Sequence, residues 1–204
     1  MPIRLFGCEM AVRKPVFLVL AFFAMSATAI ADDYDDGVAA HGKEDYATAI
    51  ARFTDAAEQG NDRAQYALGA MYHDGDGVPR DHEAAAYWYT KAAQRGNIQA
   101  QQWLCIMYRE AMGVPRDYAE SLYWCHRAAD KGSSAAQFSV GQYYFDGLGY
   151  GFKRDYVRAY IWFSRASSQG YEDARYMIER LEDEMTPLEV DEAKRLARDW
   201  QPRQ

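Results

Sequence analysis

The chain has 204 residues, of which 49% are hydrophobic and 26% are charged, a composition that supports a buried core and excludes a disordered polar chain. The formal net charge of −7 gives no excess of positive charge with which to hold nucleic-acid phosphates or an anionic membrane surface. We therefore expect a globular protein that does not bind nucleic acid.

The first 31 residues have the layout of a secretory signal peptide. Arg13 and Lys14 precede an apolar run at residues 16–25, and a small-residue site ending at Ala31 gives way to two aspartates. The apolar run is shorter than the about 20 residues that a membrane-spanning helix needs, and no later segment approaches that length. We predict cleavage after Ala31, export to the periplasm or beyond, and a mature protein that does not span a membrane.

The predicted mature chain, residues 32–204, forms one domain. Either Met1 or Met10 is the start, and Met10 brings the basic residues directly behind the first methionine while leaving the mature chain unchanged. Two cysteines remain in that chain, Cys105 and Cys125. The predicted export brings both cysteines to a compartment outside the cytoplasm, in which disulfides persist.

A repeat of 36 to 38 residues covers the mature chain. Its aspartate column comprises Asp45, Asp81, Asp117 and Asp155, its glycine column Gly60, Gly96, Gly132 and Gly170, and its tryptophan column Trp88, Trp124 and Trp162. A period in this range is typical of a solenoid, in which each unit buries its apolar face only against its neighbours. The predicted fold class is all-α.

Each unit contains two predicted helices, which we call helix A and helix B. In the second unit, apolar and small residues at positions 85, 88, 89 and 92 share one face of helix A, and those at 100, 103, 104, 107 and 108 share one face of helix B. Glycine and proline end the helices at Gly96 and at the Gly113-Val114-Pro115 turn. We expect the opening aspartate of each unit to cap helix A, and we expect the three tryptophans to lie in the core between helices and not in a ligand site.

These elements divide the mature chain into two caps and four repeats. The boundaries are 34–44 for the N-terminal cap, 45–80, 81–116, 117–154 and 155–185 for the repeats, and 186–201 for the C-terminal capping helix. The segment Thr186-Pro187-Leu188-Glu189 has the form of a capping box with proline at the first helical position, and it predicts a final helix over residues 188–200.

The column set resembles the Sel-one-like repeat (SLR) family, a relative of the tetratricopeptide solenoids. The resemblance rests on the pattern from Trp88-Tyr89 to Gly96 and on the turn Gly113-Val114-Pro115, and it covers about residues 34–200. It implies a right-handed superhelical solenoid of antiparallel helix pairs. It also implies a non-catalytic scaffold that binds a protein or peptide partner, as relatives do in envelope signalling and regulation.

The resemblance further implies a binding surface, because tetratricopeptide-like solenoids present helix A on their concave side. Side chains of helix A that the core pattern leaves free recur along the stack; they are Tyr87, Tyr123 and Ile161 beside Lys91, Arg127 and Arg165. They predict an apolar ridge with a basic edge, which suits an extended or acidic peptide. The alternative is that long basic side chains merely cover the apolar surface next to them.

A disulfide is predicted between Cys105 and Cys125. Cys105 lies on helix B of the second repeat and Cys125 on helix A of the third, and antiparallel pairing of these helices brings the two residues to similar heights. In the neighbouring repeats the same positions hold a glycine and a ring, Gly69 with Tyr89 and Gly141 with Phe163. We interpret the missing side chain as making room for the ring. The alternative is two separate buried thiols.

No motif predicts catalysis, a metal ion or a cofactor. The four histidines, His41, His73, His82 and His126, lie on different predicted elements without metal-ligand spacing. The segment Asp74-Gly75-Asp76-Gly77 occupies a repeat turn and lacks the remainder of a calcium loop, and the sequence contains no Ser-x-x-Lys. We expect a binding protein that is not an enzyme. The alternative is an envelope hydrolase or β-lactam-binding protein, which the resemblance implies because some cysteine-rich relatives bind or hydrolyse β-lactams.

Overall fold

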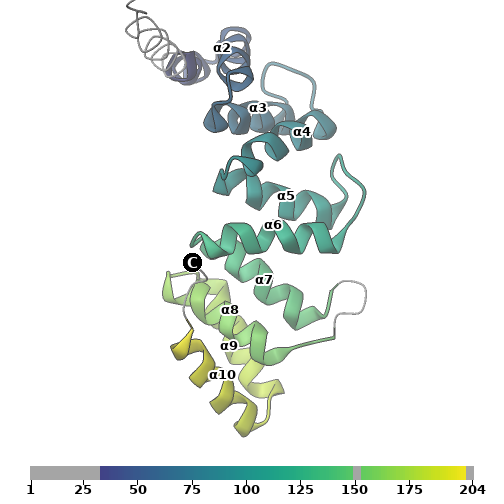
Figure 1. The fold of residues 1–204 in the computed structure, drawn as a ribbon, viewed down its shortest axis with the longest axis vertical. Coiled ribbons are helices and arrows are strands. Elements are labelled where there is room, and N and C mark those ends of the chain that lie inside the picture. The colour runs from purple at the N-terminus through teal and green to yellow at the C-terminus, as the bar shows by residue number, and fades with distance from the viewer. Residues whose placement is uncertain (1–32, 149–152, 201–204) are drawn as a thin grey trace, which may run out of the picture.

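The computed structural model describes residues 33–148 and 153–200, and the predicted signal peptide lies outside these ranges. Within them the chain is all-helical and has no β-strand, as predicted. Successive helices pack against one another as sequential neighbours and build one elongated stack (Figure 1). No helix in the described part of the chain is long and apolar enough to cross a membrane.

The helices after the first are uniform in length, with 13 residues each. A helical segment at residues 33–41 precedes them. The A helices are α2 (Tyr46–Glu58), α4 (His82–Gln94), α6 (Tyr118–Asp130) and α8 (Tyr156–Ser168), and the B helices are α3 (Asp62–Asp74), α5 (Ile98–Glu110), α7 (Ser134–Asp146) and α9 (Glu172–Glu184). The last helix, α10 (Pro187–Asp199), packs against α8 and thereby covers the C-terminal end of the stack.

The aspartate that opens each repeat caps its A helix, which confirms the prediction. The carboxylates accept hydrogen bonds from first-turn backbone amides at 2.8–3.2 Å; the residues are Asp45, Asp81, Asp117 and Asp155. Each cap satisfies an amide that has no partner within the helix and places negative charge at the positive end of the helix dipole. The predicted capping box is also present at the start of α10, between Thr186 and Glu189.

Three buried glutamines join the first three A helices, α2, α4 and α6, to the B helices that follow them. The side-chain amide of Gln101 donates to the carbonyl of Ala93 at 2.9 Å, and Gln65 and Gln137 repeat this contact with the equivalent alanines. A buried amide group needs such a partner, since an unpaired one would cost free energy of folding. The column was not singled out from the sequence, although its 36-residue spacing is visible there.

The N-terminal helix is more than a polar cap. Gly37 lies under the ring of Phe53, so close that a Cβ atom on Gly37 would stand 2.6 Å from the ring. The same contact joins Gly69 with Tyr89 in the next repeat. The segment at residues 33–41 therefore packs on α2 as a B helix packs on the following A helix.

Only one of the three column tryptophans lies in the core, which corrects the prediction for the other two. Trp124 is 7% exposed and belongs to the central core cluster. Trp88 and Trp162 are half-buried and pack at the edge of their clusters. A shared column fixes which side of the helix a residue occupies, but the side chains of the neighbouring helix decide whether it is covered.

One turn departs from its equivalents in a way that predicts a stability change. The residue after α5 is Ala111, with φ +60°, whereas α3 and α7 end at Gly75 and Gly147 in the same left-handed conformation. A side chain in that conformation costs about 1–2 kcal/mol, and glycine costs about 0.5–1 kcal/mol of chain entropy. We expect Ala111→Gly to raise the free energy of unfolding by about 0.5–1 kcal/mol.

Chemical denaturation of the variant and the parent chain measures this difference. Ala51→Gly is the matched control, since Ala51 is an exposed residue inside α2, where glycine should cost about 1 kcal/mol. Equal losses at both positions would contradict the assignment of strain to Ala111.

Candidate binding site

The six residues predicted to bind a partner lie on three A helices. Tyr87 and Lys91 are on α4, Tyr123 and Arg127 on α6, and Ile161 and Arg165 on α8. The rings of Tyr87 and Tyr123 are unusually exposed for large side chains, at 55% and 48%. We call the surface formed by these positions the helix-A face, and the positions that one A helix contributes to it a rung.

On the first two rungs the basic side chain lies over the tyrosine. The ammonium of Lys91 is 4.9 Å from the ring centre of Tyr87, and the guanidinium of Arg127 is 5.7 Å from that of Tyr123, to whose hydroxyl it also donates a hydrogen bond at 3.1 Å. The cations therefore do cover apolar surface, as the alternative interpretation expected. Their charges are nevertheless not neutralised there, because within the described ranges no carboxylate lies within 4.0 Å of Lys91, Arg127 or Arg165.

The third rung is built differently, with the guanidinium of Arg165 between two indoles. Its Cζ lies 4.3 Å from the ring centre of Trp162 and 3.3 Å from that of Trp200. Its Nη1 is buried and has no hydrogen-bond partner in the described part of the chain. Burial lowers the pKa of Arg165 to about 10, while the charge of Asp130 acts in the opposite direction, so the group remains a cation at neutral pH.

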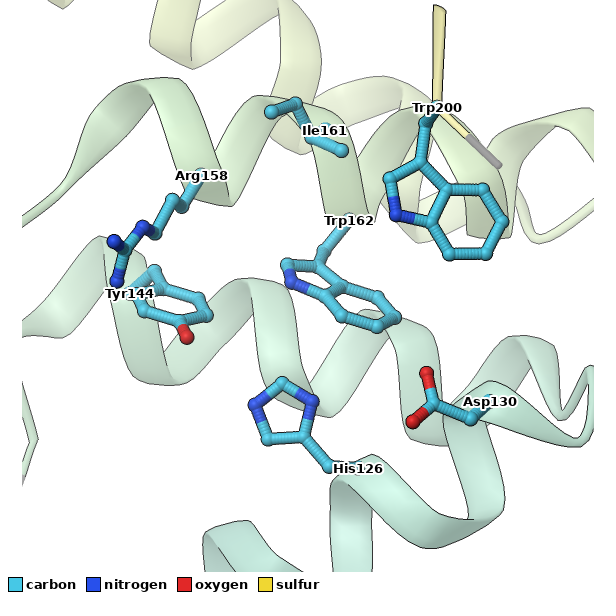
Figure 2. Close-up of a pocket in the computed structure, with 7 residues that line it drawn as sticks. All are labelled: His126, Asp130, Tyr144, Arg158, Ile161, Trp162 and Trp200. Carbon is cyan, nitrogen blue, oxygen red and sulfur yellow. The ribbon is translucent and has the colours of Figure 1, made fainter. Parts of the chain in front are cut away.

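A cavity of about 420 Å³ opens between α6 and α8, and we call it the α6–α8 pocket (Figure 2). It is lined by His126 and Asp130 of α6, Tyr144 of α7, Arg158, Ile161 and Trp162 of α8, and Trp200. The ring of His126 meets Trp162 edge-on at 5.2 Å, which shows that side chains of successive A helices touch. The walls are therefore mainly aromatic, with a carboxylate and a guanidinium at opposite sides (Figure 2).

A second cavity of about 590 Å³ lies two rungs away, between α2 and α4, and we call it the α2–α4 pocket. Its lining includes Glu58, Tyr87, Trp88, Lys91 and Arg95. Glu58 and Trp88 occupy the same repeat positions as Asp130 and Trp162 in the α6–α8 pocket. The rung between the two pockets carries the buried Trp124, so the face alternates between open and closed positions.

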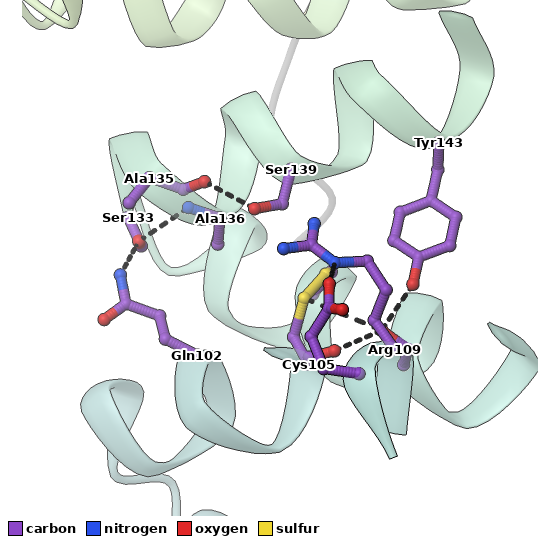
Figure 3. Close-up of a disulfide and its surroundings, with 11 residues drawn as sticks. Gln102, Cys105, Arg109, Ser133, Ala135, Ala136, Ser139 and Tyr143 are labelled. Carbon is purple, nitrogen blue, oxygen red and sulfur yellow. Dashed lines mark hydrogen bonds and ion pairs between the residues drawn. A yellow bond between two sulfur atoms is a disulfide. The ribbon is translucent and has the colours of Figure 1, made fainter. Parts of the chain in front are cut away.

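Cys105 and Cys125 form a disulfide, which confirms the predicted pairing (Figure 3). Their Cα atoms are 5.1 Å apart, both residues are buried, and neither lines a pocket of the helix-A face. Beside them the hydroxyl of Tyr143 donates to Ser121 at 2.5 Å, and the hydroxyl of Ser121 donates to the carbonyl of Cys105. The disulfide is thus part of the core between α5 and α6.

The neighbouring repeats confirm why this position accepts a cross-link. A Cβ atom on Gly69 would stand 2.5 Å from the ring of Tyr89, and one on Gly141 would stand 2.6 Å from the ring of Phe163. Glycine therefore gives the space that the ring fills. At the equivalent positions Cys105 and Cys125 fill this space with a disulfide in place of a ring packed on a glycine.

The structure brings two histidines together that the sequence placed on different elements. The rings of His73 on α3 and His82 on α4 are 5.2 Å apart, and His73 also packs on Trp103 at 4.3 Å. Within residues 33–148 and 153–200, no group of three or more histidine, cysteine, aspartate or glutamate side chains is placed to hold a metal ion.

The sequence profile of the Sel1 repeat family matches residues 62–97, 98–133 and 134–171. Each matched unit contains a B helix and the A helix that follows it, such as α3 with α4. These are also the helices that pack most extensively on each other. The predicted 36-residue period is confirmed, and the family's unit starts one helix later than the repeats that we defined from the sequence.

Two solved structures are similar to the chain. One is a protective antigen present in uropathogenic Escherichia coli strains and displaying an SLR fold; it shares 28% identity at a TM-score of 0.74, over 88% of this chain and 41% of the antigen. The other is a Sel1 repeat protein from Oxalobacter formigenes, with 28% identity and a TM-score of 0.66, over 71% of this chain and 59% of that protein. The chain therefore spans less than two thirds of either relative. No curated protein matches the sequence.

Proposed function

Because the chain belongs to the Sel1 repeat family, we propose that it is a non-catalytic scaffold that binds a protein or peptide partner through its helix-A face. One observation carries the proposal. Exposed rings and cations without a carboxylate partner recur on α4 and α6 at the same repeat positions, so the face offers aligned apolar and charged contacts along the stack. Exposed aromatic and arginine side chains of this kind are enriched where proteins bind partners.

We place this scaffold outside the cytoplasm, in the periplasm or as a secreted protein, with a role in envelope signalling or regulation. The disulfide supports the location, because such bonds persist in oxidising compartments and are rare in the cytosol. The signal-peptide layout of the first 31 residues supports it independently.

Site-specific photocrosslinking tests the scaffold role. A photoreactive phenylalanine derivative at position 123 is expected to yield one defined adduct with a partner protein in the producing organism. The same substitution at Tyr176 is the control, since this residue is 62% exposed but lies on α9, away from the helix-A face. Equal adducts from both positions, or none from position 123, would contradict the proposed binding face.

A separate prediction follows for the hydrolase alternative. Ser121 lies beside the hydroxyl of Tyr143, but it is fully buried and its own hydroxyl is engaged by the carbonyl of Cys105. A nucleophilic serine must reach its substrate, so we expect a fluorescent penicillin to leave the oxidised protein unlabelled. Gel fluorescence beside a penicillin-binding protein as positive control measures this. A covalent adduct on any serine would establish the alternative.

A further inference from the structure

We propose that the helix-A face selects an acidic, extended peptide segment carrying two large apolar side chains about six residues apart, one for each open pocket. This inference rests on the proposed scaffold role and specifies the chemistry of the partner. It combines three features of the face: the sign of its unpaired charges, the walls of its two pockets, and the spacing between them.

The face carries a row of three aligned cations on a chain of net negative charge, beside one carboxylate in each pocket, Glu58 or Asp130. The chain has a net charge of −7, yet Lys91, Arg127 and Arg165 succeed one another on the three rungs without a carboxylate within 4.0 Å in the described ranges. Carboxylates on a bound segment would complement these cations.

The pockets add aromatic walls at the two ends of this basic row, and in the α2–α4 pocket these stand beside the polar side chains Glu58, Gln65 and Gln94. Trp162, Trp200 and Tyr144 line the α6–α8 pocket (Figure 2), and Trp88 and Tyr87 line the α2–α4 pocket. Each is large enough for one aromatic or aliphatic side chain, whose burial against rings is a common source of binding free energy. The backbone amides of an extended peptide have no hydrogen-bond acceptor within the peptide itself. The carboxylate in each pocket, Glu58 or Asp130, can accept a hydrogen bond from one of them.

The spacing of the pockets sets the spacing of the anchors. The two pockets are two repeats apart. Successive A helices meet through their side chains, as His126 of α6 and Trp162 of α8 do, so they lie about one helix diameter of 10–12 Å from each other, and the pockets are separated by roughly 20 Å. An extended chain advances about 3.3 Å per residue, which gives roughly six residues between the two anchors. The intervening rung is closed by Trp124 and presents Tyr123 and Arg127, opposite which we place the acidic residues of the ligand.

Selection from a display library of random 12-residue peptides on the oxidised, mature chain tests the specificity. We expect the selected peptides to be enriched in aspartate and glutamate and to carry two large apolar residues five to seven positions apart. Changing either apolar residue to alanine should weaken binding about tenfold. Selection of basic or neutral peptides, of peptides without the paired anchors, or of no peptide at all would overturn the inference.

Variants of the protein identify the cations. With a fluorescein-labelled selected peptide, we expect Lys91→Gln, Arg127→Gln and Arg165→Gln to weaken binding about threefold each, and the triple variant at least tenfold. Arg180→Gln is the matched control, because Arg180 also lies over a ring, that of Phe145, but on α9. Unchanged affinity of the triple variant, or equal weakening by the control, would overturn the role of the basic row.

The two proposals fail in different ways. A partner adduct at position 123 together with basic or neutral selected peptides leaves the scaffold role intact and refutes the acidic, two-anchor specificity. No adduct at position 123 contradicts the scaffold role whatever the peptide library yields. Circular dichroism and thermal unfolding of each variant show whether a loss of binding comes from a loss of fold.

Discussion

Removing the disulfide by Cys105→Ala with Cys125→Ala is expected to lower the free energy of unfolding by about 3 kcal/mol. The bond closes a loop with a sequence separation of 20, and a cross-link of this size restricts the unfolded chain by about that amount. For a domain of this length the loss corresponds to a melting temperature lower by roughly 6–12 °C. Thermal unfolding of the oxidised parent and the double variant measures it.

The repeats themselves provide a matched control for the disulfide. Cys105→Gly with Cys125→Tyr copies the ring-on-glycine contact of Gly69 with Tyr89, and it should recover part of the lost stability because a ring fills the space again. Mass spectrometry of the denatured, unreduced protein provides an independent check. Two alkylatable thiols at Cys105 and Cys125, or a double alanine variant as stable as the parent, would refute the cross-link.

The tryptophan column should separate into one large and two small effects on stability. Trp124→Ala is expected to cost about 3–5 kcal/mol, because it empties a buried site in the central core cluster. Trp88→Ala and Trp162→Ala should cost about 1–2 kcal/mol each, since these side chains are half-buried and line the two pockets. Denaturant titration of the three variants gives the comparison.

The same variants distinguish packing from binding. Trp88→Ala and Trp162→Ala should weaken the affinity for a selected two-anchor peptide, because each removes a pocket wall. Equal losses of stability at all three positions would show that the column is uniformly part of the core. That result would also remove the alternation of open and closed rungs from which the anchor spacing is inferred.

Much of the architecture follows from the sequence alone. The interactions behind it are short-range: the aspartate caps and turn glycines act within a few residues, and the 36-residue columns act between adjacent helices. A residue that recurs in a column therefore makes the same local contact in each repeat. The Cys105–Cys125 pair was predictable for this reason, because Gly69 with Tyr89 already showed what meets across that helix boundary. The six helix-A positions could likewise be placed on one face by helical periodicity.

The tertiary structure decided which of those positions are open and what surrounds them. Trp88, Trp124 and Trp162 share a column, yet only Trp124 is buried, because burial depends on the packing around each side chain and not on its repeat position. Trp200 reaches Arg165 because α10 packs against α8, a contact between residues far apart in the chain that no repeat column encodes. Local periodicity thus determined the stack and its exposed face, whereas packing between distant or non-equivalent side chains determined the pockets.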